Sequence, residues 1–123
     1  MSKTVPTEPV HDLDPEDEKL ITLARSSRAR NSAAQGAAVR DVTRRTYVAT
    51  TVDLPSLRLS AVRAAVAAAA SSGAEGLQAV AVVGGPEDET ELSAEDLAAV
   101  RDMGASVVLL ASPDGTLRRV SRS

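Results

Sequence analysis

The sequence has 123 residues, of which 43% are hydrophobic and 25% are charged, a balance typical of one globular domain with one core. Cysteine is absent, which excludes disulfides, thiolate nucleophiles and zinc–thiolate sites. No apolar run approaches the roughly 20 residues that span a bilayer, and the N-terminus lacks a signal-peptide pattern. We therefore expect a cytoplasmic protein without a membrane partner.

Charge is distributed unevenly along the chain. Residues 1–24 have a net charge of −4, whereas residues 25–63 have a net charge of +6. This asymmetry can mark a surface for phosphates or for an acidic protein, or it can reflect solvated arginines on several faces. The candidate anion or RNA contacts are Arg25, Arg28, Arg30, Arg40, Arg44 and Arg45. Twelve arginines beside two lysines, with frequent alanine, also favour a GC-rich bacterial source.

The N-terminal part of the chain predicts a tail followed by a helix. Residues 1–17 contain three prolines and several acids with little to bury, which predicts a disordered acidic tail, with the folded domain over 18–123. Acids in the first turn, an apolar stripe and arginines in the last turn predict a helix over about 15–30. Two β-rich segments, 35–41 and 46–52, then predict a hairpin, although its turn lacks Gly and Asn.

The remaining segments alternate between helix and strand. An alanine-rich run over 57–72, opened by Pro55 and Ser56 and closed by Gly73, predicts a helix. Residues 77–83 and 106–111 are apolar runs typical of buried strands. Ser93, followed three residues later by an acid, predicts a helix start, and a turn over 113–116 precedes a last strand over 117–120. The order predicts a mixed sheet with helices on both faces.

Between Leu20 and Val120 the chain resembles the small cytidine deaminases. The resemblance is one of order and spacing, and it rests on five segments: Gly36–Val39, Thr51–Leu54, Ser60–Ala65, Leu92–Asp96 and Asp114–Gly115. It implies a three-layer α/β fold, the cytidine deaminase-like fold, with a mixed sheet of about five strands. An unrelated small α/β sandwich with the same order of elements is the alternative.

The resemblance also implies which residues stand at the functional positions of the family. The three zinc-ligand positions are Ser60, Ser93 and Asp96, and the glutamate that moves protons is replaced by Val62. Thr51 and Asp53 stand where the family contacts ribose. A hydroxyl is a poor zinc ligand and valine carries no proton, so these six residues represent a remnant pocket. We expect neither a metal nor another cofactor.

Three functions are compatible with this pattern. The first is a catalytically inactive, oligomeric interaction module, since the family assembles as dimers or tetramers; degenerate members suggest a link to ribosome assembly. The second is a nucleoside or nucleotide sensor that uses the remnant pocket, although binding would be weak without an aromatic wall. The third is deamination itself, which needs an activated water and an acid–base group that the sequence does not supply.

Overall fold

The computed structural model describes residues 3–5, 13–86 and 91–122. Its helices are α1 (Pro15–Asn31), α2 (Ala61–Ser71) and α3 (Ala94–Asp102), and its strands are β1 (Lys3–Val5), β2 (Gln35–Asp41), β3 (Thr46–Thr50), β4 (Val52–Leu54), β5 (Leu57–Leu59), β6 (Leu77–Gly84), β7 (Val107–Ala111) and β8 (Leu117–Arg122). None of the helices in these ranges is long and apolar enough to cross a membrane.

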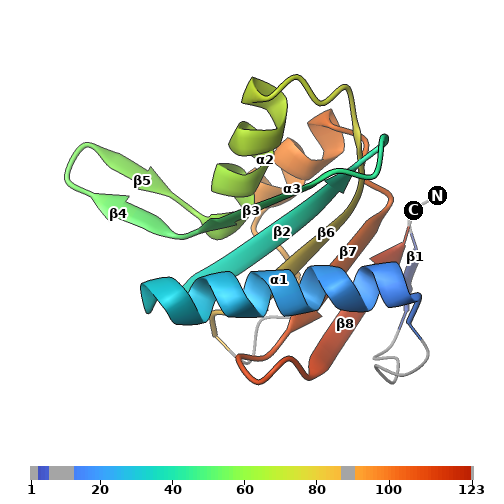
Figure 1. The fold of residues 1–123 in the computed structure, drawn as a ribbon, viewed down its shortest axis with the longest axis horizontal. Coiled ribbons are helices and arrows are strands. Elements are labelled where there is room, and N and C mark those ends of the chain that lie inside the picture. The colour runs from blue at the N-terminus through green and yellow to red at the C-terminus, as the bar shows by residue number, and fades with distance from the viewer. Residues whose placement is uncertain (1–2, 6–12, 87–90, 123) are drawn as a thin grey trace.

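Six strands form one sheet in the order β1-β8-β7-β6-β2-β3. The pairing of β6 with β7 is parallel, and the other pairs are antiparallel. Helix α1 crosses one face of the sheet, and α2 and α3 cover the opposite face (Figure 1). The prediction of a three-layer α/β fold with a mixed sheet is confirmed, with six strands in the main sheet where about five were expected.

The additional strand comes from the segment that was expected to be a disordered tail. Residues Lys3–Val5 form β1 and pair with β8 along the edge of the sheet. Leu13 is buried, and the side chain of Asp14 caps α1 by accepting a hydrogen bond from the backbone N–H of Glu16. Strand β1 and the start of α1 therefore fall within the range 1–17; residues 1–2 and 6–12 of that range lie outside the described residues.

The turn between β2 and β3 is closed by an aspartate, which explains how it forms without Gly or Asn. The buried Oδ1 of Asp41 accepts hydrogen bonds from the backbone N–H groups of Thr43 and Arg45, at 2.8 and 2.9 Å. Oδ2 accepts from the hydroxyl of Tyr47. Burial raises the pKa of Asp41, but these hydrogen bonds outweigh burial and leave it below its usual value.

The helix predicted over 57–72 is wrong at its start. Residues 57–59 form β5, which pairs with β4 in a second hairpin, and α2 begins only at Ala61. Pro55 and Ser56 form the two-residue turn of this hairpin. Proline is common both in such turns and in the first turn of a helix, so Pro55 did not distinguish the two structures. The β4–β5 hairpin projects away from the three layers (Figure 1).

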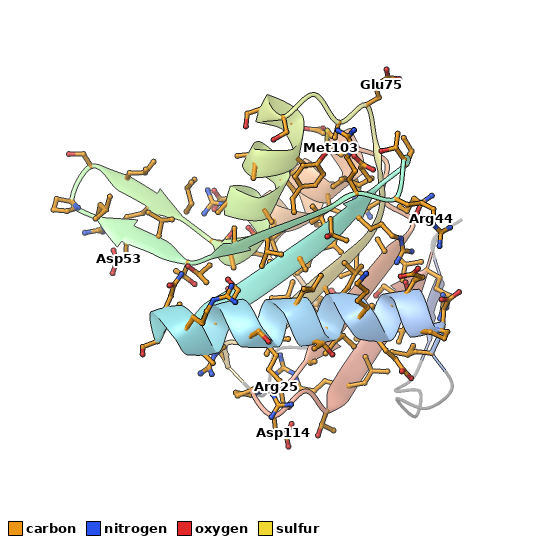
Figure 2. All side chains as sticks on the ribbon, in the orientation of Figure 1. Arg25, Arg44, Asp53, Glu75, Met103 and Asp114 are labelled. Atoms are coloured by element: carbon orange, nitrogen blue, oxygen red, sulfur yellow. The ribbon has the colours of Figure 1, made fainter. Side chains whose placement is uncertain are left out.

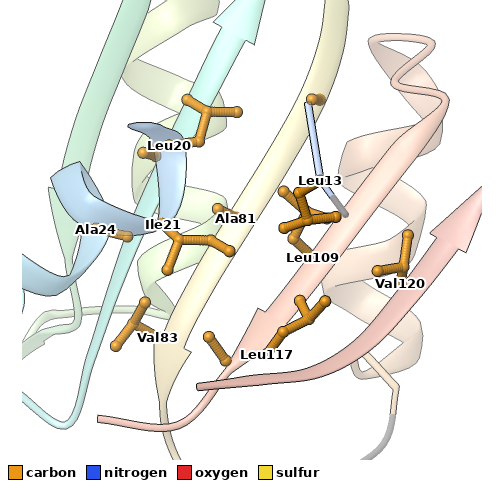
Figure 3. Close-up of a cluster of buried hydrophobic side chains, with 12 residues drawn as sticks. Leu13, Leu20, Ile21, Ala24, Ala81, Val83, Leu109, Leu117 and Val120 are labelled. Carbon is orange, nitrogen blue, oxygen red and sulfur yellow. The ribbon is translucent and has the colours of Figure 1, made fainter. Parts of the chain in front are cut away.

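The core consists of two clusters, one on each face of the sheet. The cluster under α1 includes Leu20, Ile21, Leu109 and Val120 (Figure 3). The other joins α2 and α3 to the opposite face and includes Val62 and Val100. Strand β6 contributes to both clusters, as expected of a central strand that is buried on both faces.

Candidate functional site

A pocket of about 260 Å³ lies where the first residue of β2 and the C-terminal end of β6 meet the start of α3. Three of the six remnant-pocket positions line it: Thr51, Ser93 and Asp96. On another side of the pocket, Arg118 donates hydrogen bonds to the carbonyl oxygens of Gly84 and Pro86. No aromatic side chain lines the pocket, because Tyr47, the only aromatic residue of the chain, lies at the β2–β3 turn.

Ser60 does not line this pocket, but it contacts Asp96 directly. Ser60 caps α2, and its Oγ lies 2.6 Å from Oδ1 of Asp96, to which it donates. Ser93 caps α3 in the same way, and its Oγ accepts the backbone N–H of Asp96 at 3.2 Å. The structure thus brings together the three residues at the predicted ligand positions, because the first turns of α2 and α3 lie side by side.

A fourth residue, which the sequence analysis did not select, completes this cluster. The Nε of Arg63 donates to Oδ1 of Asp96 at 3.2 Å and to Oγ of Ser60 at 3.3 Å. Its Nη1 lies 3.7 Å from the carboxylate of Glu95. The spacing between Ser60 and Arg63 could have indicated this contact. Arg63 follows the cap of α2 by three residues, so the two side chains lie on the same side of the first turn.

Val62 and Asp53 lie apart from the cluster. Val62, which the resemblance places at the family's glutamate, is 1% exposed and packs in the core between α2 and the sheet. Asp53 lies on the β4–β5 hairpin, away from the pocket (Figure 2), where its side chain is 80% exposed and forms an ion pair with Arg58. The structure therefore does not place Asp53 with Thr51 at one subsite.

The residues of the cluster do not fit a zinc ion. The hydroxyl proton of Ser60 is donated to Asp96, and the hydroxyl oxygen of Ser93 accepts an N–H. The only carboxylate at the three positions already contacts the guanidinium of Arg63, whose positive charge would repel a dication. Within the described ranges, no group of three or more His, Cys, Asp or Glu side chains is arranged to hold a metal ion.

Four of the six candidate arginines have separate contacts and do not form one patch; Arg30 lies in the last turn of α1 and Arg45 at the β2–β3 turn. Arg40 is 13% exposed and forms a buried ion pair with Asp17, at 3.0 Å, which leaves it unable to bind an external phosphate. Arg44 contacts Glu16 at the β2–β3 turn, far from Arg25, which lies beside Asp114 (Figure 2). Arg28 donates to a backbone carbonyl. The pattern matches arginines spread over several faces more closely than a single basic surface.

Comparison with known proteins assigns the chain to a family and supports the fold described above. A family model described as cytidine deaminase-like matches residues 13–115, which is most of the chain. The chain therefore belongs to the cytidine deaminase-like family. No curated protein matches it in sequence.

Three solved cytidine deaminases share the fold of this family member. The enzyme from Burkholderia pseudomallei superposes with a TM-score of 0.72 at 23% identity, over 85% of this chain and 90% of its own. The Mycobacterium leprae enzyme gives 0.65 at 23% identity, over 86% and 94%. The Mycobacterium tuberculosis enzyme gives 0.64 at 26% identity, over 86% and 91%. The cytidine deaminase-like fold expected from the sequence is thus confirmed.

Proposed function

We propose that this member of the cytidine deaminase-like family does not deaminate nucleosides and instead acts as an interaction module that assembles with copies of itself. The observation that carries the proposal is the state of the cluster at the starts of α2 and α3. Its only carboxylate, Asp96, is held by Ser60 and Arg63, and no proton-carrying side chain stands beside it at position 62.

Deamination of a pyrimidine requires an activated water and a group that moves protons to the leaving ammonia. Val62 supplies neither, because its buried hydrocarbon side chain carries no proton and activates no water. Asp96 is the only acid at these positions, and its Oδ1 already accepts hydrogen bonds from Ser60 and Arg63. These features support a protein that retains the fold without the reaction.

Self-association is supported by the β4–β5 hairpin. It projects from the body of the molecule (Figure 1), and Leu54 and Leu57, paired beside its turn, are 54% and 49% exposed. An isolated two-stranded hairpin is marginally stable in water, so a partner surface would stabilise it. Asp53 and Arg58 give the same patch one charge of each sign, which allows it to pair with its own copy across a two-fold axis.

A link to ribosome assembly remains part of the proposal, with a protein as the partner in preference to RNA. Arg40 forms a buried ion pair with Asp17, and Arg44 and Arg25 lie beside separate acids, Glu16 and Asp114, far from each other, so these three arginines form no continuous basic surface for RNA phosphates. The exposed leucines of the hairpin, by contrast, are typical of a protein contact.

A nucleoside sensor is the second candidate, and the pocket of about 260 Å³ favours it. Thr51, Ser93 and Asp96 offer polar atoms to a small ligand there. The volume is somewhat below the roughly 300–1,000 Å³ of typical small-molecule sites. Without an aromatic wall the pocket also lacks stacking, which contributes about 1–3 kcal/mol per base. Any nucleoside would therefore bind weakly.

Native mass spectrometry of the protein purified without added metal, together with a cytidine deamination assay, tests these proposals. We expect a zinc-free oligomer that releases no ammonia from cytidine.

The double variant Leu54→Ser/Leu57→Ser should shift the protein toward monomer. Val42→Ser should not, although Val42 is about as exposed as the two leucines, because it follows β2 and lies outside the hairpin. A monomeric wild type would overturn self-association, and one zinc per chain or turnover of cytidine would overturn inactivity. Retention of one nucleoside per chain would favour the sensor.

A further inference from the structure

The starts of α2 and α3 are joined by side chains at two of the predicted ligand positions, Ser60 and Asp96. Ser60 precedes the first residue of α2, and Asp96 lies in the first turn of α3. Their oxygen atoms are 2.6 Å apart, although the residues are separated by 36 positions in the chain. This bond therefore fixes two helices that meet the sheet independently.

The charges in this contact are balanced without an ion from outside the chain. The side chain of Asp96 is 11% exposed, and an isolated carboxylate at such a depth would lose much of its hydration. The guanidinium of Arg63, 35% exposed, donates from Nε to Oδ1 of this carboxylate, and its Nη1 lies 3.7 Å from the exposed carboxylate of Glu95. Arg63 also donates its backbone N–H to Ser60 at 3.1 Å, so one residue satisfies both partners.

We propose that Arg63, Ser60 and Asp96 form a metal-independent tie between α2 and α3, which we call the arginine tie. In a zinc deaminase, a dication draws ligands from the starts of two helices together. In this chain the guanidinium supplies the positive charge, and the hydroxyl of Ser60 bridges the two helices. The scaffold is thereby held closed by groups that the chain itself encodes.

The arginine tie predicts two properties of the protein's stability that can be measured. Folding does not depend on a metal, so a chelator leaves stability unchanged. The charge on Asp96 is tolerated only because Arg63 faces it, so loss of the guanidinium is more harmful when residue 96 is charged than when it is neutral. A purely packing role for the stem of Arg63 would give the same loss in both cases.

A double-mutant cycle in urea, using the full chain with and without EDTA, tests the proposal. We expect Arg63→Ala to lower the folding equilibrium constant by about 5- to 30-fold in the wild-type background. In the Asp96→Asn background the same change should lower it several-fold less, because no buried charge is left unpaired. Arg101→Ala, at an exposed arginine in the last turn of α3, is the matched control and should have little effect.

Each outcome of the cycle decides for or against the arginine tie. If Arg63→Ala fails to fold while Arg63→Ala/Asp96→Asn folds, the coupling is demonstrated directly. If Arg63→Lys, which keeps the charge, retains more stability than Arg63→Ala, the electrostatic part is supported. The proposal would be overturned if Arg63→Ala lowered the folding equilibrium constant equally in both backgrounds. It would also be overturned if EDTA lowered the urea concentration at which half of the wild-type protein is unfolded. All variants are compared at one protein concentration, and mass spectrometry of their oligomeric state distinguishes loss of the tie from loss of assembly.

Discussion

The hydroxyl of Ser60 donates to Oδ1 of Asp96 across 2.6 Å, while Oγ of Ser93 accepts the backbone N–H of the same aspartate. The two serines cap their helices in the same way but differ in their other hydrogen bonds. Among the described residues, the side chain of Ser93 bonds only within its own helix, whereas that of Ser60 caps α2 and also contacts a residue of α3. The difference between the two caps can be measured.

Ser60→Ala should destabilise the protein more than Ser93→Ala. Loss of either cap costs about 1 kcal/mol. Ser60→Ala also removes a hydrogen-bond donor from the buried carboxylate of Asp96, which adds about 1–3 kcal/mol. Urea denaturation of the two single variants measures the difference. Equal losses would mean that the contact between the helices contributes nothing beyond capping.

The buried ion pair between Arg40 and Asp17 should be essential for stability. Asp17→Ala leaves the guanidinium of Arg40 buried with only Gln78 as a partner, and breaking such a pair costs about 3–5 kcal/mol. The double variant Asp17→Leu/Arg40→Met should recover most of this loss, because no charge is left unpaired. Thermal denaturation of the single and double variants tests the pair. A double variant as unstable as Asp17→Ala would contradict this explanation.

Stability should also depend on pH through Asp41. The hydrogen bonds from Thr43, Arg45 and Tyr47 hold its pKa below the usual value, so the folded state binds this proton less readily than the unfolded state. The resulting stabilisation is complete above the unfolded pKa of about 3.9 and is lost as the pH falls through the lower folded pKa. The advantage of the wild type over Asp41→Asn should therefore shrink below about pH 4.

Tyr47→Phe is the control for this titration. It removes one of the hydrogen bonds to Asp41 and keeps the others, so its pH dependence should lie between those of the wild type and Asp41→Asn. The hydrogen bond to Asp41 also raises the pKa of Tyr47. A difference between wild type and Asp41→Asn that stays constant down to acidic pH would contradict the assignment to this carboxylate.

The sequence predicts features that depend on local pattern and misses those that depend on contacts between distant segments. Strand β3 and the cap of α3 follow from a β-branched run and from serine spacing, and they were found at or near the expected residues. Strand β1 is three residues long and owes its existence to β8, more than a hundred positions away, so no local signal marks it.

Two further differences have the same physical origin. Leu57 and Leu59 fit both an alternating strand and the first turn of a helix, and only the pairing of Asp53 with Arg58 across the hairpin resolves the ambiguity. The role of Arg63 depends on the approach of α3 to α2, which brings Asp96 within 3.2 Å. Ligand positions could be predicted from spacing, but the cation that neutralises the carboxylate could not.

The last prediction tests whether the family's metal positions have been assigned correctly. A variant with Ser60→Cys, Ser93→Cys and Asp96→Cys replaces two hydroxyls and one carboxylate with thiols at three positions that already lie close together. Because three thiolates and a water form a normal zinc site, we expect one zinc per chain, measured by mass spectrometry of the metal content.

Adding Val62→Glu should leave this ratio unchanged, since the family's glutamate is not a ligand. The matched control places three cysteines at exposed serines, Ser26, Ser71 and Ser106, on separate elements or loops. Zinc bound no more tightly than by that control would mean that the first turns of α2 and α3 do not lie as the metal site of the family requires.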